Sequence, residues 1–260
     1  MPDVQSAPRL AIVTGGQNGI GSAIARALSL AGYDVVIADL SADVTGGEFS
    51  ERWNTRRRVE CRVCDIGNPD EVAALFQWSV EQFGRPPSLL INNAAMQVWS
   101  PLIDLSLEDW ESTIRVNLTG TFLMTQHFAR HHKKAGGDDA VIINLGSGCN
   151  QVAFPNLVSY AASKGGVEML TKVSSLELGP LGIRVNCVAP GAIETERTKN
   201  ETASYAQGWS ALTPLGRIGQ VEDIANAVVA LASPDMRFVS GQTLNVDGGL
   251  FTCAPWPESY

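Results

Sequence analysis

An apolar run, a glycine-rich turn and a helical pattern follow one another near the start of the chain, and this order constrains the fold most. The run is Arg9–Thr14, the turn is Gly15–Gly21, and the helical pattern covers Ser22–Leu30. Glycines permit a tight turn and a close backbone approach, while the free N–H groups of a helix start can face a pyrophosphate. Tight turns also use glycine for steric reasons alone. In this order, however, the pattern predicts a dinucleotide site.

Strand-like and helical segments alternate along the rest of the chain. Further strand-like runs cover Asp34–Asp39, Val59–Asp65, Ser88–Ala95, Ala140–Leu145, Ile183–Ala189 and Gln242–Val246. Helical patterns cover Val72–Phe83, Ser106–Lys134, Val158 to near Gly179, and Val221–Ala232. The alternation predicts one α/β domain over residues 1–260, a Rossmann-type, doubly wound parallel sheet of about seven strands flanked by helices. Ligands are then expected at the carboxyl edge of the sheet.

Charge and hydropathy exclude several classes of partner. The chain has 260 residues and a formal net charge of −8, and its one basic run is Arg56–Arg58. This composition disfavours binding to nucleic acid or to an anionic membrane surface. No apolar run approaches the roughly eighteen residues that span a bilayer, and the first residues resemble no leader, so a cytoplasmic protein is expected.

The cysteines indicate reduced thiols. Their number is five, and they are scattered along the chain. Cys61 and Cys64 have the spacing of a metal or redox pair, but residues three apart in a strand face opposite sides. We therefore expect no metal site.

An acidic residue ends the strand-like run after the glycine turn. The carboxylate of Asp39, about twenty residues past the glycines, can accept hydrogen bonds from both ribose hydroxyls of an adenosine. It would repel a 2′-phosphate, and Asn18 brings no positive charge for one, so NAD is favoured over NADP. The alternative is that Asp39 is an ordinary turn acid.

Three later strand ends carry further candidate cofactor contacts. Asp65 and Ile66 are expected beside the adenine, because they follow the next strand of the sheet. Asn93 and Ala94 are suited to a close backbone passage against the cofactor. Thr195 can donate a hydrogen bond to a carboxamide or a phosphate in the same crevice.

The segment from Asn144 to Lys164 contains the candidate chemistry. Tyr160 and Lys164 are four apart in a helical pattern, and Ser147 follows a buried strand that can bring it beside Tyr160. A neighbouring ammonium favours phenolate, so a phenol with an ordinary pKa of about 10 can accept a proton nearer neutrality. Such pairs also occur by chance, as an exposed tyrosine with a solvated lysine.

Polar residues interrupt the long helical pattern Ser106–Lys134. Asn117 falls near its middle, where asparagine is a poor helix former and a buried amide must find partners. We expect it to bond to backbone and to hold a local distortion or a water. His127, His131 and His132 are expected at a solvated helix end.

Two segments near the C-terminus are predicted to lie outside the core. Residues 196–210 are polar, with Trp209 as their one large anchor, and are typical of a mobile lid over a substrate. The tail, residues 250–260, is expected to pack on a neighbouring subunit or to fray.

Taken in order, these motifs resemble those of the short-chain dehydrogenase/reductase family from about Leu10 to Gly249. The matching residues are Thr14, Gly15, Gly19, Ile20, Gly21, Asp65, Asn92, Asn93, Ala94, Asn117, Ser147, Tyr160, Lys164, Pro190, Gly191 and Thr195. The resemblance implies a nicotinamide cofactor, hydride transfer between an alcohol and its ketone, and a homotetramer, with a dimer as the alternative. Two positions depart from it: Ala95 replaces a usual glycine, and Gly146 replaces a serine that often precedes Ser147.

The resemblance also implies residue roles. Tyr160 is the acid/base, and Ser147 orients and polarises the substrate oxygen. Lys164 binds the nicotinamide ribose and lowers the pKa of Tyr160, while Asn117 holds a relay water. The expected cofactor-binding set is Gly15, Asn18, Gly19, Ile20, Gly21, Asp39, Asp65, Ile66, Asn93, Ala94, Tyr160, Lys164, Pro190, Gly191, Ile193 and Thr195.

The function predicted from the sequence is NAD-dependent conversion of a secondary alcohol to its ketone or lactone. Polyols and sugars are favoured, because NAD suits oxidation in a cell that keeps this cofactor largely oxidised. An alternative is a 3-oxoacyl thioester reductase, whose carrier would want a positive docking surface that this acidic chain does not obviously offer. A non-catalytic NAD-sensing regulator is an alternative of another class, but it need not keep Ser147, Tyr160 and Lys164 together.

Overall fold

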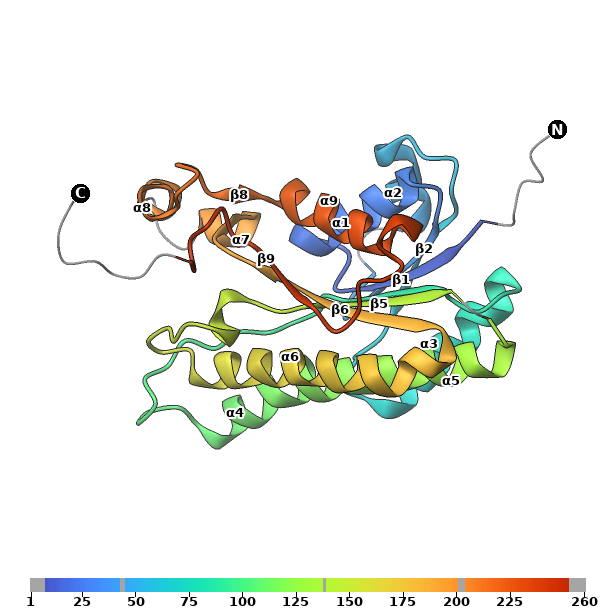
Figure 1. Ribbon diagram of the computed structural model, residues 1–260, viewed down its shortest axis with the longest axis horizontal. Coiled ribbons are helices and arrows are strands. Elements are labelled where there is room, and N and C mark those ends of the chain that lie inside the picture. Colours follow the sequence, from blue (N-terminus) through green and yellow to red (C-terminus); the bar gives the residue numbers. More distant parts are fainter. Residues whose placement is uncertain (1–7, 43–44, 138, 201–203, 253–260) are drawn as a thin grey trace.

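Seven parallel strands form the central sheet of the computed structural model, which describes residues 8–42, 45–137, 139–200 and 204–252. The strands are β1 (Leu10–Thr14), β2 (Asp34–Asp39), β3 (Val59–Val63), β4 (Leu89–Asn92), β5 (Ala140–Leu145), β6 (Ile183–Pro190) and β9 (Thr243–Val246). Their order is β3-β2-β1-β4-β5-β6-β9, and every neighbouring pair is parallel. The predicted doubly wound sheet is therefore confirmed (Figure 1).

Helices cover both faces of the sheet (Figure 1). One layer contains α1 (Gly19–Leu30), α2 (Gly46–Trp53) and α9 (Val221–Ala232). The other contains α3 (Pro69–Phe83), α4 (Leu107–Ile114), α5 (Thr121–Ala135) and α6 (Val158–Leu178). At one end of the sheet lie α7 (Glu196–Lys199), α8 (Tyr205–Leu212) and the short strands β7 (Ile193–Glu194) and β8 (Gly219–Gln220). No described helix combines the length and apolarity needed to cross a bilayer.

The strands are apolar on both sides because helices cover both faces. In β5, Val141 and Ile143 belong to the core beneath α1 and α9, whereas Ala140 and Ile142 belong to the core beneath α3 and α5. The same alternation separates the two cysteines that have metal-ligand spacing. Cys61 packs against the first core and Cys64 lies in the second, so the two thiols face opposite sides.

Local capping explains where the helices begin. The Asn68 side chain accepts hydrogen bonds from the N–H groups of Asp70 and Glu71, and Pro69 opens α3 as its sequence signature predicts. The start of α1 differs from the prediction, because the helix begins at Gly19 rather than at Ser22. The last glycines of the turn are thus part of the helix, and its first N–H groups face the carboxyl edge of the sheet.

The long helix predicted over Ser106–Lys134 is present and runs from α4 through a π-helical turn into α5. Between α4 and α5 the residues Arg115–Gly120 form a π-helical turn, and Asn117 lies within it. Such widened turns are rare and often occur at functional sites. The prediction that Asn117 lies at a local distortion of this long helix is confirmed.

The histidines of α5 do not lie at a solvated helix end. His132 is only 4% exposed, and its ring stacks on Phe128 at a centroid distance of 6.4 Å. The half-buried rings of His127 and His131 stack on Phe76 of α3, at 6.0 and 5.3 Å. The expectation of solvated histidines was wrong because α5 packs on α3 along this stretch.

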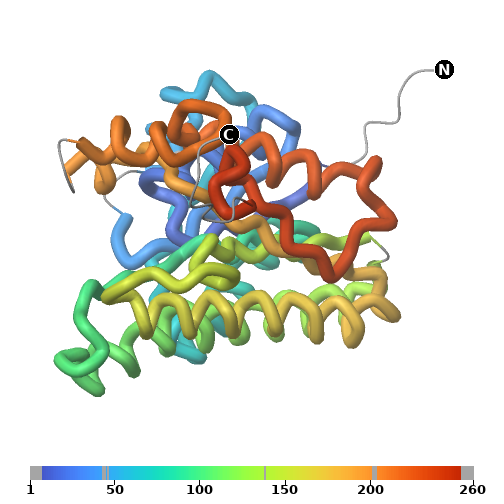
Figure 2. The backbone as a smooth tube through the Cα atoms, turned by 60° about the vertical axis from the view of Figure 1, so that its left-hand side comes forward, coloured from blue at the N-terminus to red at the C-terminus, as the bar shows by residue number. Residues whose placement is uncertain are grey.

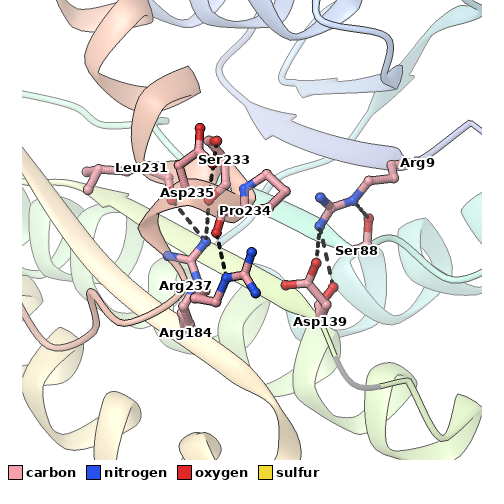
Figure 3. Close-up of polar contacts among 9 residues, drawn as sticks. All are labelled: Arg9, Ser88, Asp139, Arg184, Leu231, Ser233, Pro234, Asp235 and Arg237. Carbon is pink, nitrogen blue, oxygen red and sulfur yellow. Dashed lines mark hydrogen bonds and ion pairs between the residues drawn. The ribbon is translucent and has the colours of Figure 1, made fainter.

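The edge of the sheet opposite the carboxyl ends is joined to α9 by an arginine of β6. The guanidinium of Arg184 donates hydrogen bonds to the carbonyls of Leu231 (3.0 Å) and Ser233 (3.4 Å), where α9 ends (Figure 3). It also donates to the carbonyl of Val239 at 3.2 Å. Carbonyls at a helix C-terminus lack partners within the helix, so this side chain supplies their donors.

We predict that Arg184→Met lowers the free energy of unfolding by about 1–3 kcal/mol, because partly buried carbonyls lose their donors. Arg237→Met is the matched control. Arg237 is exposed and donates to the carbonyl of Pro234 at 3.1 Å (Figure 3), so its replacement should change stability by less than about 0.5 kcal/mol. Urea unfolding measures both variants, and equal losses would contradict the assignment.

Candidate active site

A cavity of about 1060 Å³ lies at the carboxyl ends of β1, β4, β5 and β6. The strand order reverses between β1 and β4, which is where ligands of doubly wound sheets bind. In both views α7 and α8 (orange) lie at the same end of the molecule as the yellow loop before α6 (Figures 1 and 2). The predicted site residues that line the cavity are Gly15, Asn18, Gly19, Ile20, Gly21, Asp39, Asn93, Ala94, Ser147, Tyr160, Lys164, Pro190, Gly191, Ile193 and Thr195.

The glycine turn forms the floor beside β1. Gly15 and Gly19 have positive φ angles of 62° and 54°, which favour glycine. A Cβ atom on Gly21 would lie 2.1 Å from the carbonyl oxygen of Gly15, so no side chain fits there. Asn93 fixes the turn by donating hydrogen bonds to the carbonyls of Thr14 and Gly15, both at 2.9 Å. The N-terminus of α1 and this compact backbone suit the close approach of a pyrophosphate.

Asp39 lies at the end of β2, where the sequence predicts a ribose contact. Its carboxylate lines the cavity and accepts hydrogen bonds from the N–H groups of Gln17 (3.1 Å) and Leu40 (2.8 Å). These bonds hold the carboxylate in place. Among the described lining residues the cations are Lys164 and Arg197, and both come from elements other than the glycine turn.

Asp65 and Ile66 do not line this cavity. The carboxylate of Asp65 accepts a hydrogen bond from Arg115 at 2.7 Å, and Ile66 is only 4% exposed. A Cβ atom on Gly120 would lie 2.7 Å from Cγ1 of Ile66, so the π-helical turn packs directly on this side chain. Both side chains therefore join the end of β3 to the π-helical turn, and their expected contact with the adenine stays a prediction.

Ser147, Tyr160 and Lys164 converge on one side of the cavity. Ser147 follows β5, and its hydroxyl accepts a hydrogen bond from the N–H of Cys149 at 3.2 Å. Tyr160 lies in the first turn of α6, and Nζ of Lys164 lies 5.6 Å from the centre of its ring. The Lys164 ammonium donates a hydrogen bond to the carbonyl of Leu145 at 2.7 Å. Three of the four residues predicted to be catalytic thus share one face of the cavity.

Burial governs the ionisation of both α6 residues. It raises the pKa of Tyr160 to about 12, while a hydrogen bond with Ser147 and the charge of Arg197 act in the opposite direction. Burial likewise lowers the pKa of Lys164 from 10.5 to about 8. The expected lowering of the Tyr160 pKa by Lys164 therefore stays a prediction. Desolvation dominates, and the ammonium is directed at a backbone carbonyl.

Asn117 lies behind this face and is absent from the described lining residues. Its amide oxygen accepts a hydrogen bond from the N–H of Met96 at 2.8 Å, and its amide nitrogen donates to the carbonyl of Met96 and the hydroxyl of Ser163. Ser163 in turn donates to the carbonyl of Tyr160 at 2.7 Å. The predicted backbone bonds are confirmed, and they connect the segment after β4 to the turn of α6 that carries Tyr160.

Known proteins resemble the chain over almost its whole length. Residues 15–251 match the family model described as enoyl-(acyl carrier protein) reductase. The (3R)-3-hydroxyacyl-CoA dehydrogenase of Mus musculus is 36% identical over 93% of this chain and 96% of its own. The D-threitol dehydrogenase of Mycolicibacterium smegmatis is 35% identical over 93% and 92%. The crystal structure of a gluconate 5-dehydrogenase from Burkholderia cenocepacia, in complex with NADP and tartrate, has a TM-score of 0.87 at 36% identity, covering 95% and 96%.

The chain belongs to the short-chain dehydrogenase/reductase family. It is an NAD(P)-dependent dehydrogenase that acts on a CH–OH group. The family, the fold and the reaction class predicted from the sequence are therefore confirmed.

One departure of this dehydrogenase from its family has a structural reason. A Cβ atom on Gly146 would lie 2.7 Å from the sulfur of Cys187, so the serine often found there would collide with this buried thiol. The other departure, Ala95, lines the cavity.

Residues 196–210 were predicted as a lid over the substrate, but few individual residues of the far wall of the cavity were named from the sequence. The additional lining residues are Met96, Gln97, Trp99, Leu145, Gly146, Cys149, Phe154, Leu157, Ala192, Glu196, Arg197, Thr198, Ser204, Tyr205, Gly208, Leu212, Leu250 and Phe251. They come from loops and short helices far apart in the sequence, without a shared motif. The one sequence signal for this wall was Trp209, a large ring within an otherwise polar segment that was interpreted as a lid.

We predict that Lys164→Met is stabilised relative to the wild type most strongly below pH 8. The folded-state pKa of about 8 lies below the ordinary 10.5, so the wild type carries a buried charge at a cost of roughly 3 kcal/mol below pH 8. This cost is relieved as the pH rises from 8 to 10.5, and the advantage of the variant should shrink with it. Urea unfolding between pH 7 and pH 10 measures the difference. A difference independent of pH would contradict a charged, buried Lys164.

Proposed function

We propose that this dehydrogenase oxidises a secondary alcohol with NAD, with Tyr160 as the general base. The observation that supports it best is the meeting of Ser147, Tyr160 and Lys164 in the same cavity as the glycine turn. A base, a hydroxyl that orients the substrate and a cation then face one ligand space. A non-catalytic NAD-sensing regulator would not need these three groups together.

The cofactor would lie along the glycine turn, with its adenosine ribose on Asp39. Asn93, Ala94, Pro190, Gly191, Ile193 and Thr195 line the remaining length, and Lys164 would bind the second ribose. The turn has no room for a side chain at Gly21, as expected where a pyrophosphate approaches. The carboxylate of Asp39 supports the preference for NAD, because it disfavours a 2′-phosphate.

The reaction moves one hydride and one proton from the alcohol. Ser147 donates a hydrogen bond to the substrate oxygen, and Oη of Tyr160 accepts the hydroxyl proton as the hydride leaves the carbon, which gives the ketone. When bound, the oxidised nicotinamide dinucleotide supplies the hydride acceptor and a positive ring charge that favours the phenolate. The charges of Lys164 and Arg197 favour the same ionised form. In reduction the tyrosine returns the proton.

The relatives support two substrate classes. Relatives that act on threitol and gluconate support the polyol or sugar predicted from the sequence. The relative that acts on 3-hydroxyacyl-CoA, and the family description, support an acyl thioester. The net charge of −8 disfavours an acidic carrier protein, so a small free alcohol is the better proposal.

We also propose the homotetramer that the sequence resemblance implies. Exposed apolar side chains on the layer formed by α4, α5 and α6 support it: Leu107, Phe122, Met169, Val173 and Leu176. An exposed apolar face of this kind is typical of a subunit contact.

We predict that Tyr160→Phe reduces kcat by a factor on the order of 10²–10⁴, because the proton acceptor is lost. Affinity for NAD should weaken by less than about tenfold, since at most one neutral hydrogen bond is removed. Steady-state kinetics and calorimetric titration with NAD measure the two quantities. An unchanged kcat would exclude the tyrosine from the proton transfer.

We predict that the double variant Asp39→Ser with Asn18→Arg favours NADP over NAD by at least about tenfold in kcat/KM, because a repelling carboxylate is replaced by an attracting cation. Asp65→Asn is the control, since Asp65 pairs with Arg115 outside the cavity and should leave the ratio unchanged. If the double variant keeps the wild-type ratio, Asp39 does not contact the ribose.

A further inference from the structure

Four aromatic rings form one wall of the cavity, which we call the aromatic wall: Phe154, Tyr205, Trp209 and Phe251. The ring of Phe154 lies 6.3 Å from that of Trp209 and 5.8 Å, edge to face, from that of Phe251. Tyr205 lies 6.4 Å from Trp209. All four are half-buried, and they come from the loop before α6, from α8 and from the segment after β9. Rings held in contact by three separate segments make a formed surface rather than isolated side chains.

The aromatic wall begins beside the reacting groups. A Cβ atom on Gly148 would lie 2.0 Å from the ring of Phe251, so this ring packs on the backbone next to Ser147. The N–H of Phe251 donates a hydrogen bond to the carboxylate of Asp247 at 2.9 Å, which fixes the segment. The body of an alcohol whose oxygen lies at Ser147 would therefore contact aromatic surface. Such surface favours an apolar body over one that carries many hydroxyl groups.

A cation lies at the same end of the cavity. Arg197 of α7 donates two hydrogen bonds to the side-chain oxygen of Gln97, both at 3.1 Å, and both residues line the cavity. Its positive charge lowers the pKa of Tyr160, so the guanidinium acts electrostatically at the phenol. A planar guanidinium is well suited to bind a carboxylate through two hydrogen bonds.

The other charged lining residues have different surroundings. Lys164 is bonded to a backbone carbonyl, and Asp39 lies at the end of β2 beside the glycine turn. Glu196 also lines a second cavity beside α1, together with Lys199. Arg197 is thus the cation among the described lining residues that suits an anionic group on the substrate.

We propose that the substrate is a hydroxycarboxylate with an apolar, ring-bearing body, held with the body on the aromatic wall and the carboxylate on Arg197 and Gln97. The inference rests on the proposed alcohol oxidation and names its substrate class. Oxidation would give the corresponding oxocarboxylate, with the hydride passing to the nicotinamide and the proton to Tyr160.

Four alcohols separate the two features of this proposal. They are 3-hydroxy-3-phenylpropanoate (ring and carboxylate), 1-phenylethanol (ring alone), gluconate (carboxylate on a polar body) and threitol (neither). Each is tested with NAD and with NADP. The first should exceed each of the others in kcat/KM by about tenfold or more.

Variants assign the effect to the residues. Arg197→Gln should lower kcat/KM for 3-hydroxy-3-phenylpropanoate by about tenfold or more, chiefly through KM. It should lower kcat/KM for 1-phenylethanol less than for 3-hydroxy-3-phenylpropanoate, because with 1-phenylethanol only the effect of Arg197 on the pKa of Tyr160 is lost. Lys199→Gln is the matched control. It removes a cation of the same helix that pairs with Glu194 at 3.5 Å, and both alcohols should be unaffected. Trp209→Leu should lower kcat/KM for both ring-bearing alcohols to the same extent.

The outcomes distinguish the substrate class from the reaction. Equal losses on both ring-bearing alcohols in Arg197→Gln would overturn the carboxylate site. Faster turnover of gluconate or threitol would overturn the substrate class while the proposed alcohol oxidation stands. If none of the four alcohols reduces either cofactor, the inference fails together with the proposed function.

Discussion

The hydrogen bond from the Lys164 ammonium to the carbonyl of Leu145 is the interaction on which the site depends. It joins α6 to the end of β5, the strand that delivers Ser147, so the serine and Tyr160 meet at the carboxyl edge of the sheet. The bond places a charge where burial lowers the pKa of the lysine to about 8. A buried ammonium is costly for stability, and its retention fits an electrostatic role beside a phenol.

The π-helical turn supplies a second connection to the same helix. Asn117 binds the backbone of Met96 on one side and Ser163 of α6 on the other, while Arg115 pairs with Asp65 at the end of β3. These contacts fix the parts of the chain on either side of Tyr160. They give the candidate site a rigid back, whereas the aromatic wall opposite is built from loops and short helices.

Sequence patterns within short windows predicted the strands, helices and turns that depend mainly on neighbouring residues. The strand Ala140–Leu145 and the start of α6 at Val158 were predicted to the residue, because apolar runs and helical periodicity are visible in short windows. The glycine turn, Ser147, Tyr160 and Lys164 were found for the same reason. Contacts between segments far apart in the sequence were not predicted. Asp65 pairs with a residue 50 positions away, His131 stacks on Phe76 of α3, and the aromatic wall gathers three segments.

The ionisation of Tyr160 also depends on more than sequence spacing. Desolvation raises its pKa to about 12, and this desolvation arises from tertiary packing. The central claim is that this phenol, once ionised, accepts the substrate proton. The most direct measurement is an ultraviolet difference titration of tyrosinate, wild type minus Tyr160→Phe, with and without NAD, set beside the pH profile of kcat/KM. We expect NAD to lower the ionisation pH of Tyr160 to the value at which activity rises. A phenol that stays protonated throughout the active pH range would contradict it.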